Sequence, residues 1–227
     1  MKLPLSKRIV AEAVGTFFLL AAVVGSGIMA ERLSNGNAAL ALLANTAATG
    51  AALVALIIAF GSLSGAHFNP VVTFAVAFRA GLAWNNVPFY ILAQLGGATA
   101  GVIAANKMFG LPAIFLSQHQ RSGSAQVFSE FVATLGLLSI ILAASRLHVA
   151  VVAVAVAAYI CAAYWFTAST SFANPAVTIA RSFSDTFAGI RLADVPPFVL
   201  AQFAGALVAT ILFGWLLSGE SKLEGGD

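Results

Sequence analysis

Two Asn-Pro pairs are the residues of this sequence whose types and spacing suggest a chemical role. Asn69-Pro70 and Asn174-Pro175 are 105 positions apart. Asn is a favoured helix N-cap and proline is favoured at the first helical position, so each pair predicts the start of a helix. Two such starts aimed at one point would place two partial positive charges there, which disfavours cations. The Asn carboxamides would donate hydrogen bonds to the oxygen of a neutral hydroxylated solute, whereas an ion would not recover its hydration.

A single Asn-Pro pair is more typical of a turn, but here the pair belongs to a repeat of the whole chain. Three segments match three later ones in the same order, at offsets of a little over one hundred residues. The matched segments are Ala11 to Thr16 with Ser129 to Thr134, Asn69 to Thr73 with Asn174 to Thr178, and Pro88 to Ala98 with Pro197 to Ala206. Three colinear matches are hard to obtain from biased composition, so the repeat favours a functional pair over two turns.

The composition indicates the solvent in which these pairs act. Of 227 residues, 60% are hydrophobic and 8% are Asp, Glu, Lys or Arg, where soluble domains carry about a quarter. A soluble globule with so few charges would present a mostly apolar surface to water. These values exclude a soluble enzyme, a disordered chain and a nucleic-acid binder. A single cysteine excludes an intramolecular disulfide, and neither a metal site nor a cofactor is expected.

Six apolar stretches are long enough to cross a bilayer, which takes about 20 residues. They are Ile9 to Met29, Ala38 to Phe60, Val87 to Ala105, Val127 to Ala144, Val149 to Ala168 and Val195 to Leu217. An even number of crossings puts both termini on one side, and Lys2, Lys7 and Arg8 place that side in the cytoplasm. The first apolar run exceeds the length of a signal peptide core, so it is interpreted as a retained helix.

The two segments that contain the Asn-Pro pairs are neither spans nor ordinary loops. Residues 62–79 and 169–183 stay apolar where a solvated loop would be polar. Irregular backbone at membrane depth is tolerated only where protein buries it or it lines a watery cavity. We therefore expect an all-α membrane protein with six transmembrane helices and two re-entrant half-helices. Residues 1–227 would form a single channel domain, with inverted-repeat halves at roughly 1–110 and 125–218.

With these motifs in place, the sequence resembles the aquaporin or major intrinsic protein family over nearly its whole length. The resemblance rests on the segment Ser64-Gly65-Ala66-His67-Phe68-Asn69-Pro70, a Glu-Xaa-Xaa-Gly-Thr pattern in the first span and a Gln-Xaa-Gly-Gly-Ala pattern in the third. It implies passive, bidirectional flow of water and small uncharged solutes through a homotetramer, with one pore in each subunit. It also implies a multi-pass protein of the inner or plasma membrane, in contact with lipid and with no nucleic-acid partner.

Two positions depart from the family pattern. The first motif reads Asn-Pro-Val, with Val71 where alanine is usual, and the second reads Asn174-Pro175-Ala176. The family's arginine three residues after the second Asn is replaced by Val177. Counting from the two Asn residues, the resemblance places the other selectivity-filter positions at Thr49, Ala162 and Ser171.

None of these four filter side chains is large, charged or aromatic, so the outer gate is expected to be wide and weakly polar. This filter resembles that of bacterial aquaglyceroporins of the arsenic-resistance-associated type. The resemblance implies passage of glycerol-type polyols and of undissociated metalloid acids or methylated arsenic acids, together with water.

Four other polar residues are candidates for a role in the channel. Arg181 follows Val177 by one helical turn. It either lines the outer vestibule or is a loop arginine that lies in water or pairs with Asp185. Glu12 and Glu130 occupy matching places inside spans, which favours hydrogen bonding to the re-entrant loops over proton coupling. His67 precedes the first Asn and is either a pH-sensitive gate or a packed loop residue.

Two other functions stay open at this point. A proton-coupled secondary transporter would also have inverted repeats and broken helices, and an ordinary water channel would share the whole architecture. A membrane hydrolase is disfavoured, because no serine lies in a nucleophile turn with a paired base.

Overall fold

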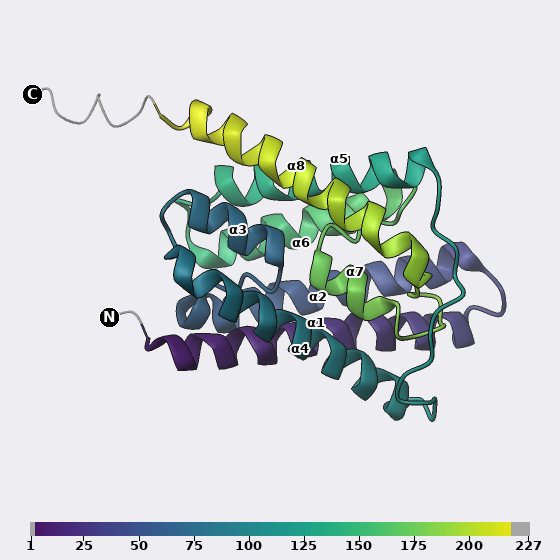
Figure 1. The fold of residues 1–227 in the computed structure, drawn as a ribbon. Helices are drawn as coiled ribbons and strands as arrows, with labels where there is room; N and C mark the ends of the chain where they lie inside the picture. Colours follow the sequence, from purple (N-terminus) through teal and green to yellow (C-terminus); the bar gives the residue numbers. More distant parts are fainter. Residues whose placement is uncertain (1–2, 219–227) are drawn as a thin grey trace, which may run out of the picture.

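The computed structural model describes residues 3–218, and in this part of the chain six helices are long and apolar enough to cross a membrane. They are α1 (Leu5–Leu33), α2 (Ala38–Ser64), α4 (Val87–Met108), α5 (Ser124–Ala143), α6 (Val149–Phe166) and α8 (Val195–Leu216). The six predicted spans are thereby confirmed. The start of α1 and the end of α8 lie at the same end of the bundle (Figure 1), called here the terminal end. Lys2, one of the three cations on which the predicted orientation rests, lies outside the described residues, and so do the two ends of the chain.

The two half-helices are also present, as α3 (Pro70–Phe78) and α7 (Pro175–Arg181). In Figure 1 α3 enters the bundle from the terminal end and α7 from the opposite end, called here the far end. Each begins at its Asn-Pro pair, as predicted. The Asn69 Oδ1 accepts a hydrogen bond from the Val71 N–H at 3.1 Å, and the Asn174 Oδ1 accepts from the Ala176 N–H at 3.0 Å.

Each half-helix packs into the opposite half of the chain. Val71, Val72 and Ala75 of α3 belong to a core cluster built mainly from α5, α6 and α8. Ala176, Val177 and Ala180 of α7 belong to a cluster with α1 and α4. The two halves are therefore interlocked, and neither would bury its apolar surface alone.

Close contact between long helices fixes the frame around the half-helices. A Cβ added to Gly97 of α4 would collide with the backbone of Ala13 in α1. A Cβ added to Gly205 of α8 would collide in the same way with the backbone of Phe131 in α5. Glycine is required at both places because the two backbones are in contact there, as in other membrane helix pairs.

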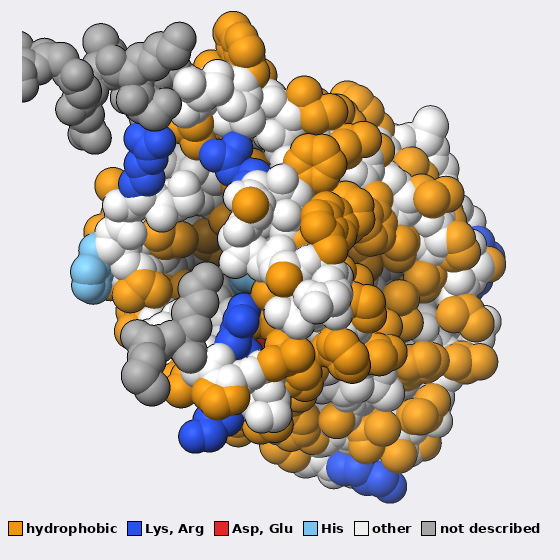
Figure 2. Space-filling view, turned by 60° about the vertical axis from the view of Figure 1, so that its left-hand side comes forward, with side chains coloured by type: hydrophobic (Ala, Val, Ile, Leu, Met, Phe, Trp, Pro, Cys, Tyr) orange, Lys and Arg blue, Asp and Glu red, His pale blue; other side chains and the backbone are white. Residues whose placement is uncertain are grey.

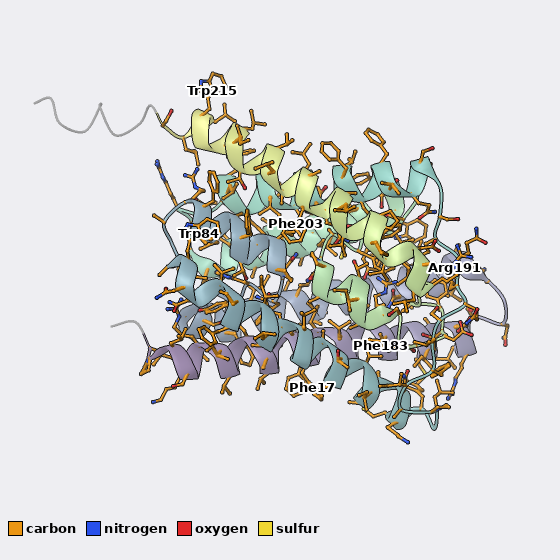
Figure 3. The ribbon with its side chains drawn as sticks, viewed as in Figure 1. Phe17, Trp84, Phe183, Arg191, Phe203 and Trp215 are labelled. Atoms are coloured by element: carbon orange, nitrogen blue, oxygen red, sulfur yellow. The ribbon has the colours of Figure 1, made fainter. Side chains whose placement is uncertain are left out.

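The outer surface suits a lipid environment. Hydrophobic side chains cover most of the flank in Figure 2, and Lys and Arg lie toward its borders. Two short 3₁₀ turns, η1 (Trp84–Asn86) and η2 (Leu192–Asp194), precede α4 and α8. Trp84 and Trp215, which are 50% and 73% exposed, lie toward the terminal end, whereas Arg191 lies at the far end (Figure 3). Exposed tryptophans near the end of a bundle are typical of a membrane interface.

Candidate functional site: the half-helix tips and the pore

The tips of the two half-helices touch each other inside the bundle. The Asn69 Nδ2 donates a hydrogen bond to the Ala173 carbonyl at 2.9 Å, and the Asn174 Nδ2 donates to the Phe68 carbonyl at 2.8 Å. Each carboxamide thus caps its own half-helix with its oxygen and bonds to the opposite loop with its nitrogen. One N–H of each carboxamide nitrogen remains for another acceptor.

The loops before the two half-helices adopt the same unusual backbone conformation. Phe68 and Ala173, directly before the Asn residues, have φ angles of 48° and 48°, and Ala66 and Ser171 have 49° and 51°. The left-handed region is uncommon for residues other than glycine and persists only when surrounding contacts hold it. The buried glutamates supply those contacts.

Glu12 holds the first loop with both carboxylate oxygens. Its Oε1 accepts from the Ser64 hydroxyl at 2.6 Å and the His67 N–H at 3.0 Å. Its Oε2 accepts from the Phe68 N–H at 2.8 Å and the Gln94 Nε2 at 2.8 Å. Four donors satisfy a buried carboxylate that would otherwise be costly at membrane depth.

Glu130 holds the second loop in the same way. Its Oε1 accepts from the Phe172 N–H at 2.9 Å, and its Oε2 accepts from the Ala173 N–H at 2.8 Å and the Gln202 Nε2 at 2.6 Å. Each glutamate therefore accepts hydrogen bonds from the re-entrant loop of its own half of the chain.

Two glutamines and two threonines, none of which is among the predicted site residues, complete this network. The Nε2 of Gln94 also donates to the Thr73 Oγ1, and the Nε2 of Gln202 to the Thr178 Oγ1, both at 2.8 Å. Each threonine hydroxyl in turn donates to the carbonyl of the capping Asn four residues earlier. The signal was available, because all four residues lie in the repeated segments.

A single cavity extends past both Asn residues and connects the two halves of the bundle. On the side of α3 its wall is aliphatic, formed by Ile57, Val72, Val76, Leu137, Ile141, Val152 and Val156. On the side of α7 it carries hydroxyl and guanidinium groups. Residues 65–68 and 171–173 of the two loops line it between these regions. This geometry is that of a pore with an apolar wall and a line of polar groups.

Comparison with known proteins agrees with this geometry. Residues 1–148 match the family model described as major intrinsic protein. The chain is 54% identical over 213 residues to aquaglyceroporin AqpS of Rhizobium meliloti (strain 1021), covering 94% of this chain and 91% of that one. It is 32% identical over 211 residues to aquaporin NIP1-4 of Oryza sativa subsp. japonica, covering 88% of this chain and 73% of that one.

The chain belongs to the major intrinsic protein family. The X-ray structure of the aquaglyceroporin from Plasmodium falciparum has the same fold, with a TM-score of 0.73, 20% identity and coverage of 96% of this chain and 97% of that one. Members of the family are membrane channels and not enzymes, as predicted. No group of three or more His, Cys, Asp or Glu residues suited to a metal ion is found among residues 3–218.

Three of the four filter positions expected from the family pattern line the pore. They are Thr49 of α2, Ser171 in the second loop and Val177 of α7. Ala162 of α6 is an exposed residue and is not among those that line the cavity. The prediction for Ala162 is wrong, because Ile160 and Tyr164 present their side chains to the pore instead.

The expectation of a filter without large, aromatic or charged side chains is also wrong. Tyr164, Phe172 and Arg181 line the same cavity as Val177. The Arg181 guanidinium stacks on the Phe172 ring, with 3.5 Å from the guanidinium carbon to the ring centroid. Of the two alternatives for Arg181, the structure favours the vestibule: the residue is 3% exposed, and Asp185 accepts from the Gln118 N–H instead.

The remaining motif residues serve packing and loop geometry. Val71 is fully buried in the core cluster with Leu138 and does not line the pore, so it adds no bulk to the constriction. His67 lines the pore. Its Nδ1 lies 3.0 Å from the Thr73 Oγ1, within hydrogen-bond distance, and the centroid of its ring lies 5.3 Å from that of the Tyr90 ring. The histidine is therefore held by the same network as the loop.

Proposed function

We propose that this chain is a passive channel of the aquaglyceroporin type for small neutral hydroxylated solutes and water. The observation that carries the proposal is the reciprocal bond between the tips, Asn69 to Ala173 and Asn174 to Phe68, beside one cavity shared by both halves. The 54% identity to a protein named as an aquaglyceroporin supports it.

The chemistry of the pore explains how such a solute would pass. The free N–H groups of the two Asn carboxamides donate to a solute oxygen in place of water. The aliphatic wall opposite accommodates the carbon side of a polyol, or the apolar side of a methylated acid. An ion would lose its hydration shell without gaining enough ligands to replace it.

Undissociated metalloid acids and methylated arsenic acids are proposed as solutes alongside glycerol-type polyols. The support is the small size of Thr49, Ser171 and Val177 on one part of the outer wall. Tyr164, Phe172 and Arg181 narrow the other part, so the solute must be compact.

Proton-coupled transport is the less favoured alternative. A proton added to Glu12 would displace one of the four donors that fill its carboxylate. The Glu130 carboxylate accepts three hydrogen bonds that favour its charged form. An ordinary water channel remains the second candidate, favoured by the aromatic and guanidinium groups at the outer mouth.

We further propose that the protein is a homotetramer in the plasma or inner membrane, with both termini in the cytoplasm. The repeat halves at roughly 1–110 and 125–218 would then enclose one pore in each subunit. Lys7 and Arg8 at the start of α1 support this orientation.

Purified protein in liposomes tests the function. Stopped-flow light scattering would follow water, glycerol and arsenous acid entry separately. We expect all three to exceed protein-free liposomes and to stop at equilibrium, with or without an imposed pH gradient. Accumulation of solute against its gradient would support coupled transport, and water flux without entry of glycerol or arsenous acid would support a water channel.

A further inference from the structure

Two buried arginines meet on one aromatic ring at the outer end of the pore. Arg181, from the end of α7, is 3% exposed, and Arg121, from the connection between α4 and α5, is 8% exposed. Their guanidinium carbons lie 3.5 Å and 5.0 Å from the centroid of the Phe172 ring. Buried guanidinium groups are rare unless they are paired or have a function, and neither of these forms an ion pair with a carboxylate among residues 3–218.

Each of the three guanidinium nitrogens of Arg121 donates a hydrogen bond to a backbone carbonyl of the protein. Its Nε donates to the Gly189 carbonyl at 2.8 Å, its Nη1 to the Ser169 carbonyl at 3.2 Å, and its Nη2 to the Phe187 carbonyl at 3.4 Å. Burial lowers the pKa of Arg121 to about 10, which still leaves the guanidinium charged at neutral pH. Arg121 therefore ties the second loop to the segment after α7 as a fixed positive charge.

Arg181 uses only part of its donor set. Its Nε donates to the Ala188 carbonyl, and no hydrogen bond from its Nη1 or Nη2 is found within the described part of the chain. A guanidinium has five N–H donors, so the four on Nη1 and Nη2 remain for a ligand. The side chain lines the pore. The buried Ser171 hydroxyl, on the same cavity, also has no partner among these residues.

We propose that Arg181, held in place by Phe172 and Arg121, replaces the arginine that the family carries at position 177. This inference rests on the proposed function. Arg181 contacts the solute: its free N–H groups donate to the oxygens of a neutral hydroxylated solute at the outer mouth. Its charge, with that of Arg121, excludes cations, because like charges repel strongly at a site shielded from water.

Arg121 is the positioning residue of the pair. Arg181 has two partners, the Phe172 ring and the Ala188 carbonyl. Arg121 holds carbonyls near both, one three residues before Phe172 and two on either side of Ala188. Without Arg121 we expect Arg181 to lose its fixed position at the pore wall while the tips of the half-helices stay joined.

Ion and solute fluxes of variants in liposomes test the proposal. We expect Arg181→Met to raise potassium flux roughly tenfold or more, and also to lower glycerol flux, because the solute loses the N–H donors at the outer mouth. Arg181→Lys keeps the charge and should keep potassium out. Arg79→Met removes an exposed arginine after α3 and serves as the matched control, with no expected change in either flux.

Arg121→Met should raise potassium flux as well, and the double variant should leak no more than Arg181→Met alone, because the two residues act through one site. Potassium exclusion by Arg181→Met equal to that of the wild type would overturn the proposal. Loss of thermal stability and glycerol flux in Arg121→Met, without any potassium leak, would overturn the positioning role. Wild-type protein that passes no glycerol would instead contradict the proposed function, so the two failures are distinguishable.

Discussion

The carboxamide nitrogen of Asn69 lies 2.9 Å from the carbonyl oxygen of Ala173, a residue that precedes the other capping Asn. One side chain therefore caps its own half-helix and fixes the position of the opposite tip. This double use explains why asparagine, and not another capping residue, occupies both positions.

Substitution of Asn69 by Asp separates the two uses. Asp is as good an N-cap as Asn, but it has no N–H for the Ala173 carbonyl, and its second oxygen would face that carbonyl. We expect Asn69→Asp to lower stability by about 2 kcal/mol and to abolish most glycerol flux. Thermal unfolding in detergent measures the loss of stability, and stopped-flow uptake measures the loss of flux. Asn174→Asp should show the same two effects as Asn69→Asp. Normal flux through both variants would contradict the role of the tips.

The buried glutamates give a second prediction. Glu12→Gln replaces one acceptor oxygen by an NH₂ group, which then faces donors such as the Phe68 N–H. Each unsatisfied buried donor costs about 1–3 kcal/mol, so the variant should unfold at lower temperature and lose flux. Glu130→Gln should also unfold at a lower temperature and lose flux.

The exposed Glu31 provides the control for this pair, because within residues 3–218 its carboxylate accepts a single hydrogen bond, of 3.3 Å, from the Phe187 N–H. Glu31→Gln should leave stability nearly unchanged. Glutamine variants with wild-type stability but altered pH dependence of uptake would instead point to proton coupling.

Adjacent glycines on α4 give a third prediction. A Cβ at Gly97 would collide with the Ala13 backbone, whereas a Cβ at Gly96 would meet no heavy atom within 4 Å. Gly97→Ala should therefore separate α1 from α4 and destabilise the fold, while Gly96→Ala should be neutral or stabilising by up to about 1 kcal/mol. Thermal unfolding of both variants measures the difference, and equal stability would mean that the α1–α4 contact is looser than described.

The parts of the site that repeat along the chain were predictable from sequence. The Asn-Pro caps and the glutamates occur twice in matching places, so each copy supports the assignment of the other. Ala162 was misplaced because its position was counted back from Asn174 through the turn that follows α6. An error of one or two residues in that turn rotates a helical position by about 100° for each residue.

Arg121 gave no signal in the sequence for a different reason. It lies in the polar part of the connection between α4 and α5, residues 117–123, which has no periodicity. Its burial depends on how that connection folds over the far end of the pore. Its contacts with Ser169 and Gly189 join segments that are 48 and 68 residues away. Such contacts follow from the fold as a whole and not from local pattern.

Position 177 provides the last prediction. Val177 lines the pore one helical turn before Arg181, so Val177→Arg would place two guanidinium groups at neighbouring points of one wall. The added bulk should reduce arsenous acid and glycerol entry by about tenfold and water entry by less than about twofold, because only the larger solutes need the space. Val177→Met, which adds bulk without charge, distinguishes narrowing from repulsion. Equal loss of water and of the larger solutes in Val177→Arg would count against position 177 as part of the filter.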